Sequence, residues 1–333
     1  MDLTTRYLGL TLNNPLVASA SPLTRDLGNI RRLEDCGAAA VVLPSIFEEE
    51  IEAEAAEAER LTAPHGESFA EAVSYFPATM DSGTGPNAYL ELIRRAREAV
   101  AIPVIASLNG VSRSGWCDYA RLVEQAGASA IELNAYLIAS DLQVDSREIE
   151  TRYLDVLKSV RASVAIPLAV KLGPYFSATG HMAKALAEAG ADGLVLFNRF
   201  YQPDINLPTL SLRRDLELSR PAEIRLPLLW IGVLAGNINA SLAASSGVDS
   251  AEEVVKYLLV GADAVMTTSA LLRHGIEHMA VLAAGLREWL AARDIDRVSR
   301  IRGRMRRGAL GDPAAFDRAN YIQILQDFVA ENH

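Results

Sequence analysis

Cysteine is scarce in this sequence, and its scarcity excludes several kinds of chemistry. The 333 residues contain two cysteines, Cys36 and Cys117, at a spacing that forms no metal-binding or iron–sulfur motif. A disulfide-stapled secreted domain is equally excluded, because such domains need several paired cysteines. We therefore predict no metal site, and any redox chemistry has to come from a bound cofactor.

Positive charge and long apolar runs are also lacking. The chain carries 32 Lys and Arg against 42 Asp and Glu, a formal net charge of -10, so a phosphate backbone or an anionic membrane would be repelled. Its longest apolar run, 226–236, is too short to cross a bilayer, and no basic segment followed by an apolar core opens the sequence. We expect a soluble, cytoplasmic protein with no nucleic-acid and no membrane partner.

What the sequence does contain is a recurring phrase, Gly-Ala before an apolar run. It occurs at 36–43, 126–133, 189–196 and 260–267. Glycine tolerates the left-handed conformation of a helix C-cap, so each phrase predicts a helix that ends and turns directly into a strand. At 100–108 and 164–172 a proline stops a helix just before a strand.

These junctions predict eight strands that alternate with helices. We expect them at 16–20, 39–45, 102–108, 129–134, 166–172, 193–198, 241–246 and 263–268. Continuously apolar strands between helices are typical of an α/β protein with a parallel sheet, and eight such units favour a (β/α)₈ TIM barrel. A doubly wound open sheet is the alternative, but no G-x-G-x-x-G follows the first strand. Alternation around Asn13 and Asn14 predicts an N-terminal β-hairpin.

We expect residues 1–333 to form a single domain with two insertions. Residues 48–87 and 199–235 interrupt the rhythm directly after a strand, so we interpret them as lids over the barrel mouth. The segment from about residue 293 to residue 333 is predicted to form a C-terminal helical tail. Its arginine-rich part, 297–308, indicates a solvated helix or a subunit contact, because the chain as a whole is acidic.

Polar residues gather at the predicted strand ends, where barrel enzymes carry their chemistry. The hydroxyl and amide members are Ser19, Ser21, Ser45, Ser107, Asn109, Asn134, Asn198, Ser245, Ser246, Thr268 and Ser269. A single serine at such a place is more often a helix cap, but here every strand contributes. Lys171 ends the fifth strand between apolar neighbours, so it needs an anion or an acceptor. An ion pair with Glu132 is the structural alternative, and both readings can hold together.

The ligand that suits these groups is planar and phosphorylated. The amides Asn109, Asn134 and Asn198 each offer a donor and an acceptor to the edge of a heterocycle. The last two strands end in small polar turns that open helices, which is the usual phosphate position in barrels. FMN fits this description.

At these residues the chain resembles the dihydroorotate dehydrogenase family along nearly its whole length. The likeness rests on "NNPLVASAS", "AIELN", "LAVKLGPYF", "LVLFNRF" and "SSGVDSAEEVVKYLLVGADAVMTTSALLRHG". The ELN and VKLxPYF pair is typical of class 1 members. The resemblance implies an FMN-dependent flavoprotein of pyrimidine biosynthesis, often a cytoplasmic homodimer. Its activity would be oxidation of dihydroorotate to orotate, or of a related small-molecule substrate, at a C–C bond next to a carbonyl.

The resemblance also assigns site residues. It implies flavin contacts for Ala20, Ser21, Ser45, Asn134 and Lys171, with Asn109 added from its place at the third strand end. Phosphate contacts are implied for Ser246, Gly247, Thr268 and Ser269. Asn134 and Asn198 would hold the substrate beside the ring.

Three substrate-facing positions depart from the family. Leu137 stands where class 1 enzymes have a cysteine base, Ala139 where an asparagine contacts orotate, and Pro44 where a lysine ends the second strand. Losing a positioned base typically costs about 10² to 10⁴ in rate. Tyr136 is a candidate acid or base, although a tyrosine pKa near 10 argues against an unaided base, and a packed loop aromatic is the alternative.

Three functions stay open at this point. The first is an FMN-dependent dehydrogenase acting on CH–CH groups, with Lys171, Asn134 and Tyr136 as its catalytic candidates. The second is a divergent paralogue that acts on a different substrate or binds flavin without catalysis. The third is a flavin-free aldolase or lyase that uses Lys171 as a Schiff base. A separate electron-acceptor protein is a possible partner, because the chain has no cluster-type cysteines.

Overall fold

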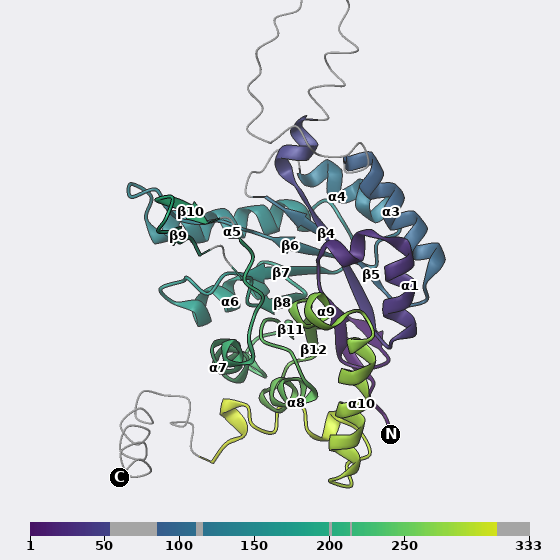
Figure 1. The fold of residues 1–333 in the computed structure, drawn as a ribbon. Helices are drawn as coiled ribbons and strands as arrows, with labels where there is room; N and C mark the ends of the chain where they lie inside the picture. Colours follow the sequence, from purple (N-terminus) through teal and green to yellow (C-terminus); the bar gives the residue numbers. More distant parts are fainter. Residues whose placement is uncertain (54–84, 111–115, 200–201, 214, 312–333) are drawn as a thin grey trace, which may run out of the picture.

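The computed structural model describes residues 1–53, 85–110, 116–199, 202–213 and 215–311, and these form a closed parallel barrel (Figure 1). The strands run in the order β11-β12-β3-β4-β5-β6-β7-β8. They are β3 (Leu16–Ala18), β4 (Ala40–Phe47), β5 (Val104–Asn109), β6 (Ala130–Asn134), β7 (Leu168–Leu172), β8 (Gly193–Leu196), β11 (Ser241–Ala244) and β12 (Ala264–Thr267). The eight predicted strands and the TIM barrel are confirmed, and the open-sheet alternative is wrong.

Helices connect the strands and lie outside the barrel (Figure 1). They are α1 (Leu27–Asp35), α3 (Pro86–Ala99), α4 (Trp116–Gln125), α5 (Ser146–Arg161), α6 (Thr179–Glu188), α7 (Arg225–Leu234), α8 (Ala251–Val260), α9 (Ser269–His274) and α10 (His278–Ala291). The glycines of the recurring phrase, Gly37, Gly127, Gly190 and Gly261, all have positive φ between 94° and 116°. Each therefore ends its helix in the conformation that the sequence predicts. None of the helices in the described ranges is both long and apolar enough to span a membrane.

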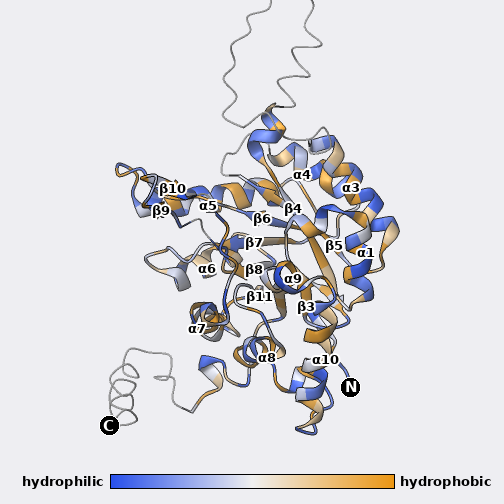
Figure 2. Ribbon diagram, in the orientation of Figure 1, coloured by the Kyte–Doolittle hydropathy of each residue, from blue (hydrophilic) through white to orange (hydrophobic). Residues whose placement is uncertain are grey.

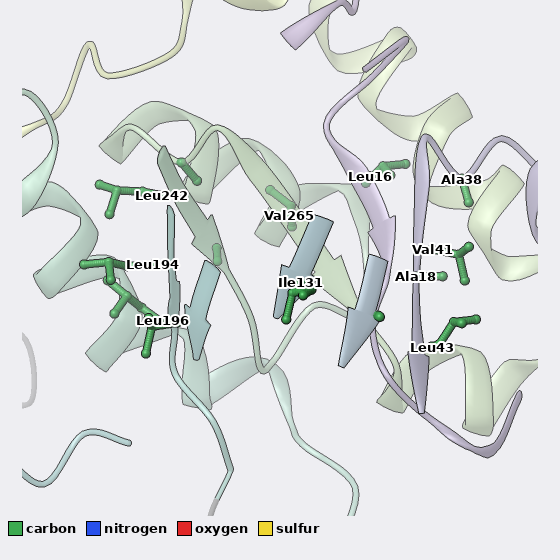
Figure 3. Packing of buried hydrophobic residues seen from close by; sticks show 14 of the residues in the cluster. Leu16, Ala18, Ala38, Val41, Leu43, Ile131, Leu194, Leu196, Leu242 and Val265 are labelled. Carbon is green, nitrogen blue, oxygen red and sulfur yellow. The ribbon is translucent and has the colours of Figure 1, made fainter. Parts of the chain in front are cut away.

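Each strand is buried on both faces because successive side chains point in opposite directions. On β8, Leu194 and Leu196 join the apolar cluster between strands and helices, whereas Val195 belongs to a second cluster inside the barrel. Figure 3 shows the outer cluster, with Leu194, Leu196 and Leu242 on neighbouring strands. Figure 2 shows apolar residues along the strands and mixed colouring on the helices around them. This double burial explains why the strands read as continuous apolar runs.

The predicted N-terminal hairpin closes the end of the barrel at which the strands begin. It consists of β1 (Thr5–Tyr7) and β2 (Leu10–Leu12), which pair antiparallel. Tyr7, Leu8 and Leu12 pack in the inner cluster, among small inward residues of the strands. A Cβ on Gly193 would lie 2.5 Å from the Leu8 side chain, so glycine is needed on β8 to admit the hairpin.

The predicted insertions and tail need correction in three places. Residues 225–234, taken as part of the second lid, form α7, which packs against α6 and α8 in the outer ring. The rest of that insertion includes a small exposed hairpin of β9 (Asp204–Asn206) and β10 (Ser211–Arg213) and the 3-10 helix η2 (Pro221–Ile224). Of the first insertion, residues 54–84 lie outside the described residues, and 86–87 begin α3.

The described part of the predicted helical tail is not an α-helix. Residues 293–311 form turns and the short 3-10 helices η3 (Val298–Arg300) and η4 (Arg307–Ala309). Backbone bonds from Gly303 to Leu258 and from Met305 to Leu259 hold this segment against the end of α8. Because tertiary backbone bonds replace helical ones, the arginine-rich sequence follows the barrel surface. Residues 312–333 lie outside the described residues.

Candidate functional site

The strand ends place their polar side chains in matched levels inside the barrel mouth. Asn109 of β5 is in register with Asn134 of β6, and Asn134 is in register with Lys171 of β7. Two residues earlier on its strand, Glu132 has the same inward direction as Asn134. Neighbouring parallel strands thus bring amide, carboxylate and ammonium groups to one place, as the sequence predicts for this end of the barrel.

An irregularity in β4 brings Ser45 into register with Ser107 of β5, which is itself in register with Glu132 of β6. The pairing with β5 shifts between Val42 and Ser45, and past the shift Ser45 lies opposite Ser107. The two hydroxyl oxygens are 2.7 Å apart. Three residues of β4 here span two of β5, so the strand contains one extra residue. The extra residue reverses the alternation of the side chains that follow it, and Ser45 therefore faces inward.

Lys171 and Glu132 form a buried ion pair. Their Nζ and Oε1 atoms are 3.3 Å apart, with side-chain exposures of 10% and 1%. Lys171 also donates to Ser19 Oγ at 3.4 Å, whereas Glu132 Oε2 is buried and has no hydrogen-bond partner in the part of the chain that the structure describes. The ion-pair alternative is therefore formed in the structure. Lys171 still lines the cavity at the mouth, so the pair does not remove it from the site.

The amides form a chain of hydrogen bonds across the mouth. Asn198, which follows β8, donates its Nδ2 to Asn134 Oδ1 at 2.5 Å, and Asn134 donates its Nδ2 to Ser45 Oγ at 3.5 Å. Asn109 is buried beside them. The network orients several side chains that the sequence assigned to cofactor or substrate.

We use "hydroxyl side" for Ser246, Gly247, Thr268 and Ser269, at the ends of β11 and β12. Together with Ala20, Ser21, Lys171 and Asn198, these residues line a cavity of about 250 Å³. The hydroxyls are held in place locally, since Ser246 donates to Phe197 O at 3.4 Å and Thr268 donates to Ser19 O at 3.2 Å. Most of the sequence-predicted cofactor residues are thus brought to one cavity. Ser45 lines a different cavity, next to Pro44 and α3.

A segment of the second insertion, residues 215–220, covers the hydroxyl side, and we call it the strap. Its Ser219 Oγ accepts from Gly247 N at 3.1 Å and donates to Ser269 Oγ at 2.9 Å. Arg273 donates to Ser219 O at 3.0 Å. Sequence reasoning missed Ser219, because nothing in the local pattern of 215–220 indicates that its serine returns to the ends of β11 and β12.

Gly247 fits beneath the strap only because it has no side chain. Its φ is +71°, and a Cβ would lie 2.7 Å from Ile224 Cγ2 and 2.9 Å from Arg220 O. An alanine here would meet both an unfavourable backbone conformation and a steric overlap.

The opposite side of the mouth is apolar. We use "apolar side" for Leu137, Ile138 and Ala139, which follow β6, and Tyr175 and Phe176, which follow β7. They line a cavity of about 440 Å³ together with Ile149, Tyr153 and Gly173. The expected base position, Leu137, thus lies in the wall of an apolar cavity.

Tyr153, in the wall of this cavity, offers no ready base. Tyr153 donates to Ala135 O at 2.9 Å, and burial raises its pKa to about 12, so it is a proton donor at neutral pH. Tyr136, the catalytic candidate, is half-buried and is not among the residues that line these cavities. Cys117 lies on α4, where its thiol contacts Ser159 O, away from the mouth.

Comparison with known proteins identifies relatives. No protein-family model matches the chain. It is 29% identical over 207 residues to an Aeropyrum pernix protein assigned as dihydroorotate dehydrogenase A (fumarate), covering 60% of this chain and 66% of that protein. With the catalytic subunit of dihydroorotate dehydrogenase B (NAD(+)) of Thermoplasma acidophilum it is 26% identical, over 82% of this chain and 89% of the relative.

A third relative carries a different printed activity. The NAD-dependent dihydropyrimidine dehydrogenase subunit PreA of Escherichia coli is 24% identical over 64% of this chain and 56% of its own length. The chain therefore spans less than two thirds of the first and third of these relatives. The names of the three relatives describe dehydrogenases of dihydroorotate or of a dihydropyrimidine.

Proposed function

Because this chain is a divergent relative of the dihydroorotate dehydrogenases, we propose that it is an FMN-dependent oxidoreductase acting on a C–C bond next to a carbonyl. One observation carries the proposal. Lys171, Asn198 and the hydroxyl side line a single cavity at the barrel mouth, and Asn134 is hydrogen-bonded to its rim.

The donor set suits FMN. Ser246, Gly247, Thr268 and Ser269 would hold the phosphate, at the usual phosphate position in barrels. Its oxygens would replace Ser219 Oγ as the acceptor at Gly247 N, and Phe197 O and Ser19 O as acceptors of the Ser246 and Thr268 hydroxyls. Ala20, Ser21, Ser45, Asn109, Asn134 and Lys171 would hold the ring and its edge. When bound, FMN supplies the acceptor for the hydride. Two carboxylates lie at this cavity, Glu132 below it and Glu217 in its lining, and each forms an ion pair, with Lys171 and Arg220 respectively, so neither opposes an anionic ligand with an uncompensated charge.

The roles of the chain's own residues follow from their chemistry. Lys171, whose ammonium has a third N–H beyond those given to Glu132 and Ser19, would donate a hydrogen bond to the ring edge. Asn134 and Asn198 would orient the substrate carbonyl by hydrogen bonds. Leu137 can neither accept nor donate a proton, which leaves Tyr136 or solvent to exchange it. We therefore propose two candidate substrates of similar standing, dihydroorotate and a different carbonyl-containing compound, and dihydroorotate is the first to test.

A second candidate, a flavin-binding protein without catalysis, is favoured by the apolar residue at the base position. A Schiff-base lyase is less well supported, since Lys171 is engaged by both Glu132 and Ser19. Schiff-base chemistry needs a free amine, whereas the Lys171 nitrogen is held by these two partners. A cytoplasmic location, a homodimer and a separate electron acceptor remain parts of the proposal.

The test is cofactor uptake followed by reduction. Purified protein mixed with FMN is expected to retain yellow flavin through gel filtration, and anaerobic dihydroorotate or a related substrate is expected to bleach it. Ser269→Ala should weaken FMN binding by about tenfold or more, because a hydrogen bond to a charged group contributes about 1.5–3 kcal/mol.

Ser211→Ala, on the exposed β9–β10 hairpin, is the matched control and should bind FMN like the parent. A protein that takes up no FMN contradicts the proposal. Flavin that binds but is reduced by no dihydropyrimidine favours the non-catalytic alternative.

A further inference from the structure

The apolar side contains a preformed cavity that the proposed cofactor does not use. Its volume, about 440 Å³, exceeds the 250 Å³ of the cavity on the hydroxyl side. Among the residues that the structure describes, no charged side chain lines it. Of its two tyrosines, Tyr153 already donates its hydroxyl to Ala135 O. An ionic group placed there would lose its hydration without gaining a counter-ion.

The walls of this cavity start at the reacting end of the barrel. Leu137–Ala139 follow Asn134 at the end of β6, and Gly173–Phe176 follow Lys171 at the end of β7. A further cavity of about 330 Å³, lined by Tyr175, Asn198 and Ser246 among others, adjoins both. It shares Tyr175 with the apolar cavity, and Asn198 and Ser246 with the cavity on the hydroxyl side. The intermediate cavity, which Arg199, Glu223 and Arg225 also line, therefore lies between Asn198 and the apolar wall.

The walls are held in position without a ligand. Tyr153 of α5 fastens the first loop through Ala135 O, and its ring meets Phe176 of the second loop edge-to-face at 5.3 Å. Leu137 packs against the main apolar core. At the rim, however, Ile138 and Tyr175 are 51% and 69% exposed. Preformed apolar walls with an uncovered apolar rim are typical of a small-molecule site.

We propose that this cavity binds an apolar alkyl or aryl substituent of the substrate. It deepens the proposed function, on which it rests, by giving the substrate two ends: a carbonyl that the mouth amides bind and a hydrocarbon group that the apolar side covers. Burying each CH₂ of that group should raise affinity by about fourfold until the cavity is full.

The test uses a series of conjugated ketones, 3-penten-2-one, 3-hepten-2-one and 3-nonen-2-one, titrated into the FMN-loaded protein with flavin absorbance as the readout. Dissociation constants should fall by about an order of magnitude with each two added CH₂ groups. The same series is titrated calorimetrically into FMN-free protein, because the apolar walls belong to the chain itself.

Two variants should move the chain-length dependence in opposite directions. Ala139→Leu adds three carbons to the wall and should abolish the preference for the longer ketones. Ile149→Ala should shift the preference towards chains longer than nonenone. Ala165→Leu, exposed in the turn before β7 at the other end of the barrel, is the control and should keep the parent's dependence.

Dissociation constants that do not change with chain length, or a dependence that survives Ala139→Leu, would overturn the inference. Failure to take up FMN, with chain-length dependence retained in the calorimetric series, would overturn the proposed function and leave the apolar site standing. The two failures are therefore distinguishable.

Discussion

The two sides of the barrel mouth are built from the same kind of strand end but differ in chemistry. On the hydroxyl side, hydrogen bonds join residues from three separate segments, Ser219, Gly247 and Ser269. On the apolar side, Leu137, Ile138 and Phe176 line a cavity whose described lining residues are all uncharged. The barrel positions both sides equally well, so the difference comes from the loops. A barrel can therefore keep a cofactor cradle while the loops beside it change the substrate.

The largest expected effect is at Lys171, which lines the cavity on the hydroxyl side. Lys171→Met leaves the Glu132 carboxylate buried without its partner, and we expect the free energy of unfolding to fall by about 3–5 kcal/mol. Urea denaturation of the FMN-free protein measures this change.

Adding Glu132→Leu to Lys171→Met should recover most of the lost stability, because an apolar pair can replace a buried ion pair at little cost. FMN binding should be weaker than in the parent in both the single and the double variant, because both lack the Lys171 ammonium. A Lys171→Met variant as stable as the parent would show that the ion pair does not contribute to the free energy of unfolding.

A smaller effect is expected where the strap crosses Gly247. Gly247→Ala combines a left-handed alanine with overlap against Ile224 and Arg220, and should cost about 2–4 kcal/mol of stability and weaken FMN binding. Gly9→Ala is a close match, because Gly9 has φ +72° and open space around it.

Gly9→Ala should cost only about 1–2 kcal/mol, from its backbone conformation alone, and leave FMN binding unchanged. Urea denaturation and FMN titration of the two variants separate conformational strain from overlap at the cradle. Equal losses would mean that the close packing over Gly247 has no energetic consequence.

The smallest effect is expected at Ser219. Ser219→Ala removes the hydroxyl that bonds Gly247 and Ser269, and a net loss of about 1 kcal/mol should make hydrogen exchange in 215–224 about fivefold faster. Exchange in 137–142, on the apolar side, should not change. Uniform acceleration in both segments would contradict a local role for the strap.

Fold prediction succeeded where the signals are local. A glycine at a helix end followed by an apolar run marks each helix-to-strand junction, and Gly37, Gly127, Gly190 and Gly261 all adopt the required positive φ. It failed where tertiary bonds compete with local preference. Residues 297–308 are rich in arginine and suit a helix, but backbone bonds to Leu258 and Leu259 hold the chain in turns.

Strand alternation was enough to predict that Asn134 and Lys171 lie at the barrel mouth, whereas their roles in binding and catalysis stay predictions. The inward direction of Ser45 depends on an irregularity in β4 between Val42 and Ser45, for which Pro44 is the one local signal. Ser219 lies about 30 to 50 residues from its partners Gly247 and Ser269. Contacts over such separations depend on how a loop closes, and hydrogen bonding at one serine leaves no periodic trace in the sequence.

By itself the sequence determined the barrel, the order of its strands along the chain and the polar character of their ends, because period-two alternation and glycine C-caps act within a few residues. The sequence offered the Lys171–Glu132 ion pair as one of two alternatives, and the structure shows it formed. The tertiary structure alone decided that the strap covers Gly247 and that the loops after β6 and β7 line an apolar cavity. These features arise from side chains that meet only when the barrel closes, and their energies depend on burial, which is a property of the packed molecule.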